Sequence, residues 1–150
     1  MTWPARTWVA AELISATIMN AYVRDPITQL RSRSIVVGFG DAAGDVLTTG
    51  VKAYIEVPFD CNVIGWTVMA NVSGSVVIDV WRDSYANFPP TVADTITGSE
   101  KPTLASAQKN QDLALTTWSP AIAQGDILGL NVDSVATIKQ VVLNLRVDLT

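Results

Sequence analysis

The last apolar segment of the chain, residues 138–149, alternates between two kinds of side chain. One side holds Val141, Leu143, Leu145, Val147 and Leu149, and the other holds Gln140, Asn144, Arg146 and Asp148. Successive side chains of a strand point to opposite faces, so this segment is predicted to have one face in a core and one in water. That pattern is typical of antiparallel sheets.

Period-two patterns also predict strands earlier in the chain, at residues 34–39, 52–58, 62–72, 76–82, 113–118 and 127–133. Residues 71–75 are predicted to turn a hairpin between two of them. Residues 83–110 hold three of the seven prolines and are predicted to be a surface excursion, with at most a short strand near residues 95–97. About eight short strands predict a mainly β protein, an antiparallel β-sandwich of jelly-roll type. A small barrel is the alternative. No internal repeat is visible, which excludes a solenoid or propeller.

The chain divides into an N-terminal arm and helix, residues 1–34, and a β-sandwich domain, residues 35–150. Ser15 is a predicted N-cap, residues 16–24 have helical character, and Asp25-Pro26 predicts either a second cap or a kink. Residues 31–34 are predicted to be the linker.

The predicted helix carries a wide apolar surface. One stripe is formed by Ala16, Met19, Val23, Ile27 and Leu30, and an adjacent one by Ile14, Ile18 and Tyr22. So much apolar surface is not stable on an isolated helix in water. The helix is therefore expected to pack on its own body or on a neighbouring copy.

Trp3 and Trp8 flank Pro4 and Arg6 with a spacing that suits an extended arm lying in a groove. Bulky aromatic side chains in such an arm act as anchors in pockets. Trp3, Trp8, Met19, Val23, Ile27 and Leu30 are the predicted interface with a partner or a second copy.

Charge is scarce and unevenly distributed. The chain is 49% hydrophobic and only 16% charged, which predicts further burial in an assembly. Residues 1–34 carry a net charge of +2 and the remainder −6. An acidic body argues against binding of nucleic acid. No segment approaches the length of a membrane span, and no signal peptide is recognisable, so no membrane partner is expected.

Little in the sequence suggests catalysis. There is no histidine, and a lone cysteine, Cys61, leaves neither a disulfide nor a zinc site; it is predicted to lie in the core. Asp41 with Asp45, and Asp79 with Asp83, are the nearest carboxylate pairs. Residues 38–43 match G-x-G-x-x-A, but no helix is predicted to follow, so no dinucleotide is expected. We expect no enzyme activity, catalytic residue, metal or cofactor.

Trp66 lies between apolar residues and is predicted to be core. A glycan-binding surface is the alternative use of the aromatic residues that follow, and its candidates are Trp81, Arg82, Asp83 and Tyr85, with Phe88 nearby. Exposed aromatic rings stack on sugar rings; otherwise these side chains cover the edge of the core or a subunit contact.

The N-terminal Trp, the Glu12-Leu13-Ile14-Ser15-Ala16 stretch, Asn20 and Val23-Arg24-Asp25 resemble the start of many tailed-bacteriophage virion proteins. Residues 52–66, 73–81, 89–104 and 113–133 resemble a β domain that recurs in phage fibre, tail and decoration proteins. Ala11 replaces the usual Gly, and Pro26 follows Asp25 where that group has a longer helix. The resemblance implies a structural virion protein, a homotrimer that docks on capsid or tail proteins, with host glycans as a further partner.

Overall fold

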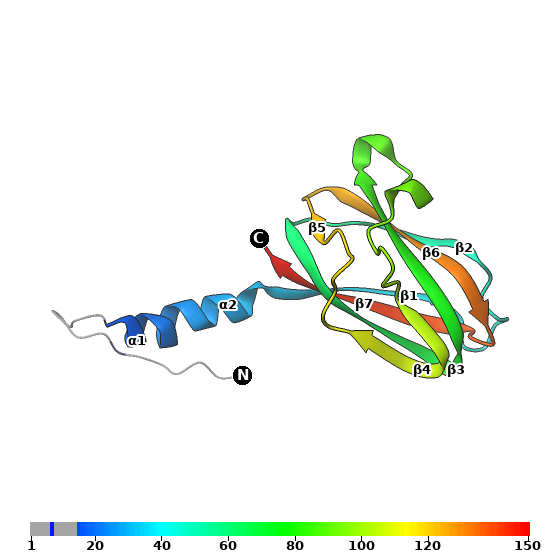
Figure 1. Cartoon of the computed structure of the whole chain (residues 1–150), viewed down its shortest axis with the longest axis horizontal. Helices are drawn as coiled ribbons and strands as arrows, with labels where there is room; N and C mark the ends of the chain where they lie inside the picture. Colours follow the sequence, from blue (N-terminus) through cyan, green and yellow to red (C-terminus); the bar gives the residue numbers. More distant parts are fainter. Residues whose placement is uncertain (1–6, 8–14) are drawn as a thin grey trace.

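The computed structural model describes residue 7 and residues 15–150, except for the side chains of Thr28 and Gln29. A helical segment leads directly into an antiparallel sheet of seven strands (Figure 1). The helical segment comprises α1 (Ala16–Met19), a π-helical turn (Asn20–Arg24) and α2 (Asp25–Arg31). The strands are β1 (Ser32–Gly40), β2 (Gly50–Glu56), β3 (Cys61–Ser84), β4 (Thr103–Asp112), β5 (Ala121–Ile122), β6 (Asp126–Ala136) and β7 (Gln140–Leu149). Short 3-10 turns cover Tyr85–Asn87 and Val92–Asp94.

The sheet runs in the order β1-β7-β3-β6-β2, with β4 and β5 also paired to β3. It curls so that β1 and β2, at the two ends of this order, come into contact. Buried side chains from both halves of β3 and from β6 and β7 meet in one core cluster. The predicted antiparallel β-sandwich of jelly-roll type is confirmed.

The long strand β3 belongs to both layers of the sandwich. Residues 61–70 pair with β7, and residues 75–84 pair with β6. Between them, at Met69–Gly74, the register with β4 shifts and the strand turns a corner. The hairpin predicted at residues 71–75 is therefore wrong, because the two halves of β3 pair with other strands and not with each other.

Gly74 lies at this corner because a side chain would not fit there. A Cβ atom on Gly74 would lie 2.6 Å from the carbonyl oxygen of Ala136 and would also clash with the hydroxyl of Thr137. Thr137 itself has a φ of 67°, in the left-handed region, where β6 turns into β7. The corner of β3 at Gly74 and the turn at Thr137 thus lie next to each other, where each segment passes from one layer to the other.

The alternating pattern of the last strand is confirmed. Val141, Leu143, Leu145 and Val147 are at most 1% exposed, and Leu149 packs against the same cluster. Cys61 and Trp66, 1% and 4% exposed, are core residues as predicted. The core thus forms within the β body, without any residue of α1 or the π turn, neither of which has a buried residue.

Three local predictions are wrong. The predicted linker at residues 31–34 does not exist, because α2 ends at Arg31 and β1 begins at Ser32. The predicted strand at residues 113–118 is a loop, although Trp118 is buried. The strand in this region is β4, most of which lies in the second half of the predicted excursion. Leu104 is its one buried residue and most of its other positions are exposed on either face, so no apolar alternation marks it.

The helix itself begins as predicted. The Ser15 hydroxyl accepts a hydrogen bond from the backbone N–H of Ile18 at 3.3 Å, which is the N-cap contact. Of the cap and the kink predicted at Asp25-Pro26, the structure shows no side-chain cap. The backbone N–H of Asp25 reaches back to the carbonyl of Asn20, a π-type bond, so the helix widens by one residue just before the proline. No helix within the described residues is long and apolar enough to cross a bilayer.

Candidate interaction sites

The helical segment presents apolar side chains to solvent. Met19, Ile27 and Leu30 are 41%, 54% and 57% exposed, and Val23 is half-buried. Figure 1 shows the helix leaving the body and running away from it, so the sandwich covers none of its length beyond the last turn. Of the two arrangements that the sequence allows, packing on its own body is not seen for this stretch. Trp3 and Trp8 lie outside the described residues.

The direction of the helix is fixed where it meets the sheet. The Arg31 guanidinium donates two hydrogen bonds to the carbonyl oxygen of Leu149, at 2.8 and 2.6 Å. The Ser32 hydroxyl donates to Asp148 at 2.7 Å, and the two residues are partners in the β1–β7 ladder. The end of α2 is thus held against the last residues of β7.

The four residues predicted as a glycan surface do not share one face. Trp81 and Asp83 lie two residues apart on β3, so they point to the same side, and Arg82 points to the other. Arg82 donates to the carbonyl of Ala121 at 2.9 Å and lies 3.4 Å from a carboxylate oxygen of Asp126. Tyr85, in the 3-10 turn after β3, is 78% exposed.

A different set of aromatic side chains gathers on the outer side of β2, β6 and β3. Tyr54, Gly129 and Trp81 lie in one row across these strands. Pro90 lies over Gly129, where a Cβ atom would come within 3.1 Å of the Pro90 ring and 3.4 Å of Tyr54. Phe88 meets Tyr54 edge to face, with 4.9 Å between ring centroids.

We call Tyr54 and Phe88 the aromatic corner. They are 44% and 51% exposed, respectively. Trp81, by contrast, is flanked by the Gly129–Pro90 contact on one side and by the isolated bridge to Thr95 on the other. In the sequence, Tyr54 lies between Ala53 and Ile55 in a predicted strand, so the alternation places its ring on the opposite face from theirs. Its partner Phe88 lies on a distant loop, and no short-range pattern connects the two.

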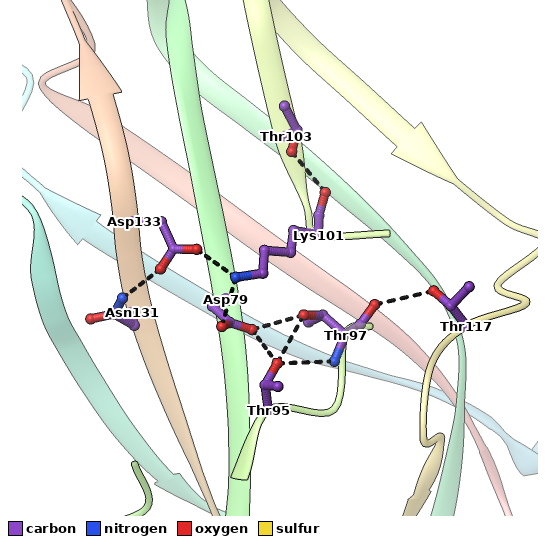
Figure 2. A network of polar contacts seen from close by, with 8 residues as sticks. All are labelled: Asp79, Thr95, Thr97, Lys101, Thr103, Thr117, Asn131 and Asp133. Carbon is purple, nitrogen blue, oxygen red and sulfur yellow. Dashed lines mark hydrogen bonds and ion pairs between the residues drawn. The ribbon is translucent and has the colours of Figure 1, made fainter. Parts of the chain in front are cut away.

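A network of hydrogen bonds and ion pairs connects residues 95–103 to the outer side of β3 and β6, the side that also carries the aromatic corner (Figure 2). Asp79 on β3 is fully buried and accepts hydrogen bonds from the hydroxyls of Thr95 and Thr97 at 2.6 and 2.7 Å. The Lys101 ammonium lies 2.9 Å from Asp79 and 2.7 Å from Asp133 on β6. Asp79, considered in the sequence for catalysis, thus contacts its neighbours as a structural ion.

The charges in this network are stabilised as ions. Burial alone would raise the pKa of Asp79, but the bonds from Thr95, Lys101 and Thr97 outweigh it and lower that pKa. The hydrogen bond to Asp133, and more weakly the contact with Asp79, raises the pKa of Lys101. Both groups therefore stay charged over a wider pH range than they would in an unfolded chain.

Glu100 secures the loop at residues 113–118. Its carboxylate accepts the backbone N–H groups of Thr116 and Thr117, at 2.8 and 2.7 Å, and both of their hydroxyls. These bonds, the Thr116 hydroxyl first, lower the pKa of Glu100 to about 2. The loop is thus ordered by a carboxylate, without any strand pairing.

The outer face of the other layer is more apolar. Val36 on β1 and Met69 and Ile64 on β3 are 60%, 46% and 39% exposed. A hollow of about 270 Å³ beside Met69 is lined by Thr67, Lys109, Asn110 and Gln111. Its lining side chains are a hydroxyl, an ammonium and two amides, with no carboxylate or thiol.

The remaining candidates for chemistry have structural roles. Asp41 accepts the backbone N–H of Ala43 within its own turn at 3.0 Å. Burial, with a smaller contribution from Asp60, raises the pKa of the Cys61 thiol, which keeps it protonated. Within residue 7 and residues 15–150, no group of three Cys, Asp or Glu side chains is placed to hold a metal ion. Residues 38–43, the G-x-G-x-x-A match, form the end of β1 and a turn, not a helix N-terminus.

Comparisons with known proteins identify no family. No protein-family model matches the sequence, and no curated protein matches it. A chain from the structure of infectious bursal disease virus, Gx strain, is similar over 80% of this chain at 10% sequence identity, with a TM-score of 0.34. This chain spans 37% of the length of that one. At that TM-score the similarity carries no argument about fold or function.

Proposed function

We propose that this protein is a non-enzymatic structural component of a tailed-phage virion, a fibre, tail-associated or capsid-decoration protein. It attaches through its N-terminal segment and projects the β-sandwich outward. The observation that carries this proposal is the helix of residues 16–31, which leaves a body with a complete core of its own and keeps Met19, Ile27 and Leu30 exposed. The resemblance of the N-terminal motif to virion proteins supports the same role.

The exposed face of this helix supports self-association, and the resemblance to virion proteins suggests a homotrimer. A helix of about 16 residues is marginal by itself in water, and most of its stability must come from packing of its apolar face. Copies of the same helix supply such packing, and the Arg31 and Ser32 contacts then place the bodies around a common axis. Trp3 and Trp8 remain the proposed anchors on a capsid or tail protein.

Light scattering on the purified full chain tests this oligomer. A trimer has three times the chain mass of 16.1 kDa, and an Ile27→Asp/Leu30→Asp double variant should shift toward the monomer. Val92→Asp, at a position 66% exposed on the sandwich, is the matched control and should leave the mass unchanged. A monomeric parent at micromolar concentration, with no mass gain on adding virion proteins, would refute the homotrimer.

Attachment is tested separately by incorporation into particles. Trp3→Ala/Trp8→Ala should reduce incorporation by orders of magnitude, because burying one such side chain contributes roughly 1.5–3 kcal/mol. The melting temperature of the sandwich should stay the same. Normal incorporation would remove the anchor role from the two tryptophans.

Recognition of a host glycan is the second candidate function. It is favoured by the exposure of Tyr85 and Phe88 at 78% and 51%, on the excursion that follows Trp81. A saccharide that shifts the Trp fluorescence of the parent protein, and not that of Tyr85→Ala, would support it. No shift in fluorescence or melting temperature with any host-surface glycan would count against it.

A further inference from the structure

We propose that the aromatic corner, Tyr54 and Phe88, together with Glu56, binds an organic ammonium group. The proposal concerns the sandwich alone and does not depend on the attachment role of the helix. It rests on the geometry of two half-exposed rings, on the carboxylates around them, and on where the neighbouring cations are held.

The two rings form a pre-arranged corner. Their centroids are 4.9 Å apart and their planes meet at 68°, so they enclose an angle and do not stack flat. The Tyr54 ring lies beside Gly129 on the neighbouring strand β6. Pro90, on the loop that also carries Phe88, lies over the same glycine. A cation within about 6 Å of a ring centroid is attracted by the electrons of the ring face.

Glu56 supplies a negative charge beside this corner. It lies two residues after Tyr54 on β2, on the same side of the sheet, and it is exposed. Within residues 15–150 its carboxylate has no hydrogen-bond or ion-pair partner. Glu56 is therefore free to pair with a ligand.

Further carboxylates surround the corner. Asp83 lies in the same row as Glu56, with Ile127 between them. Asp94 accepts two hydrogen bonds from Thr91, the residue after Pro90, and the backbone bond from Thr91 is the main cause of the lowered pKa of Asp94. The corner is thus bordered by negative charges.

The neighbouring cations are occupied elsewhere. Lys52 donates to the Thr48 hydroxyl and the Thr49 carbonyl. Arg82 contacts Asp126 on the opposite face, and Lys101 lies between Asp79 and Asp133. Because none of the described lysines and arginines is paired at the corner, charge complementarity selects a positively charged ligand over a neutral or acidic one.

The test is an NMR titration of the full chain, following the ring protons of Tyr54 and Phe88. Choline is the quaternary probe, and N-acetyl-lysine methylamide is the primary one. Both should shift the two rings; tighter binding of choline would indicate a headgroup or surface polymer, and tighter binding of the lysine derivative a protein partner. The control ligand is the neutral analogue of choline in which carbon replaces nitrogen, and it should bind at least about tenfold more weakly.

Variants separate charge from ring contact. Glu56→Gln keeps the shape and should weaken choline binding about threefold to tenfold, with the effect disappearing at high salt. Phe88→Ala should abolish binding, while Tyr85→Ala, at an exposed aromatic outside the corner, should leave it intact. Unchanged melting curves verify that each variant is folded.

Three results would overturn the proposal. Equal binding of choline and its neutral analogue would show an apolar contact only. Binding unaffected by Glu56→Gln would remove the carboxylate from the site. Shifts of the two rings with lactose but not with choline would assign the corner to a saccharide.

Discussion

In the sandwich, apolar side chains of β3, β6 and β7 bury one another, whereas in the helix of residues 16–31 Met19, Ile27 and Leu30 stay 41% to 57% exposed. Both regions form regular backbone hydrogen bonds, the first between strands and the second within the helix. The difference lies in what else holds them. Tertiary burial stabilises the body, and the helix has a cap, local hydrogen bonds and two contacts at Arg31 and Ser32.

The comparison is sharpest for the same substitution in the two regions. Leu143→Ala removes a fully buried side chain of β7 and should lower the free energy of unfolding by about 2–5 kcal/mol. Leu30→Ala, at a position 57% exposed in the single chain, should change it by less than about 0.5 kcal/mol when the protein is measured at concentrations where it is monomeric. Urea unfolding of both variants provides the measurement. A loss at Leu30 as large as that at Leu143 would mean that the helix contributes to the core.

The next largest loss of stability is expected from substitutions in the buried polar network around Asp79. Asp79→Asn removes a buried charge that accepts from Thr95, Thr97 and Lys101, and should cost about 1–3 kcal/mol. Asp133→Asn, at a carboxylate that is 31% exposed, is the milder control.

The loss of stability caused by Asp79→Asn should depend on pH in a definite direction. Because the pKa of Asp79 is lower in the folded state, its stabilisation is complete above the ordinary carboxyl pKa and is lost as the pH falls through the folded value. The gap in stability between the parent and Asp79→Asn should therefore narrow in acid. A gap that stays constant from neutral pH to acid would contradict the ionised state of Asp79.

A local effect is expected at Glu100. Glu100→Gln should speed amide exchange at Thr116 and Thr117 and leave the global melting transition almost unchanged, since the side chain ties down only an exposed loop. In the parent, the pKa of about 2 predicts that protection persists until the pH approaches that value. Loss of protection already near the ordinary carboxyl pKa would disprove the tight contact.

The smallest effect on the body is expected from the helix cap. Ser15→Ala removes the bond to the N–H of Ile18 and should destabilise the helix by about 0.5–2 kcal/mol. Circular dichroism and amide exchange within residues 16–24 would report the loss, and the melting of the sandwich should not move. Ser15→Asp, which preserves a capping oxygen, is the matched control.

The sequence predicted what short-range patterns determine. The alternation of β7, the burial of Cys61 and Trp66 and the Ser15 cap depend on neighbours a few residues apart, and the structure confirms them. The corner at Gly74 was not predictable, because Ser73-Gly74 has the composition of a tight turn and only contact with Thr137 shows why the glycine is there. The alternation test does not detect β4, because Leu104 is its one buried residue and most positions on both of its faces are exposed.

The candidate site was predicted only in part. The exposed apolar residues of the helix follow from their spacing. The aromatic corner depends on Tyr54 and Phe88, which are 34 positions apart and meet where the loop that carries Pro90 lies over Gly129. Asp79 was considered for catalysis because the sequence shows a carboxylate within a strand, but not the lysine that neutralises it or the two threonines that donate hydrogen bonds to it.

The direct passage from α2 into β1 has a mechanical consequence. In Figure 1 the helix enters the sheet nearly in line with β1, whose nine residues are all paired with β7. A pull on the helix, with the body held at its far end, would load the ladder along its length and strain all of these pairs together. Shear of this kind resists force better than peeling bonds apart one at a time, so the join is suited to carrying tension.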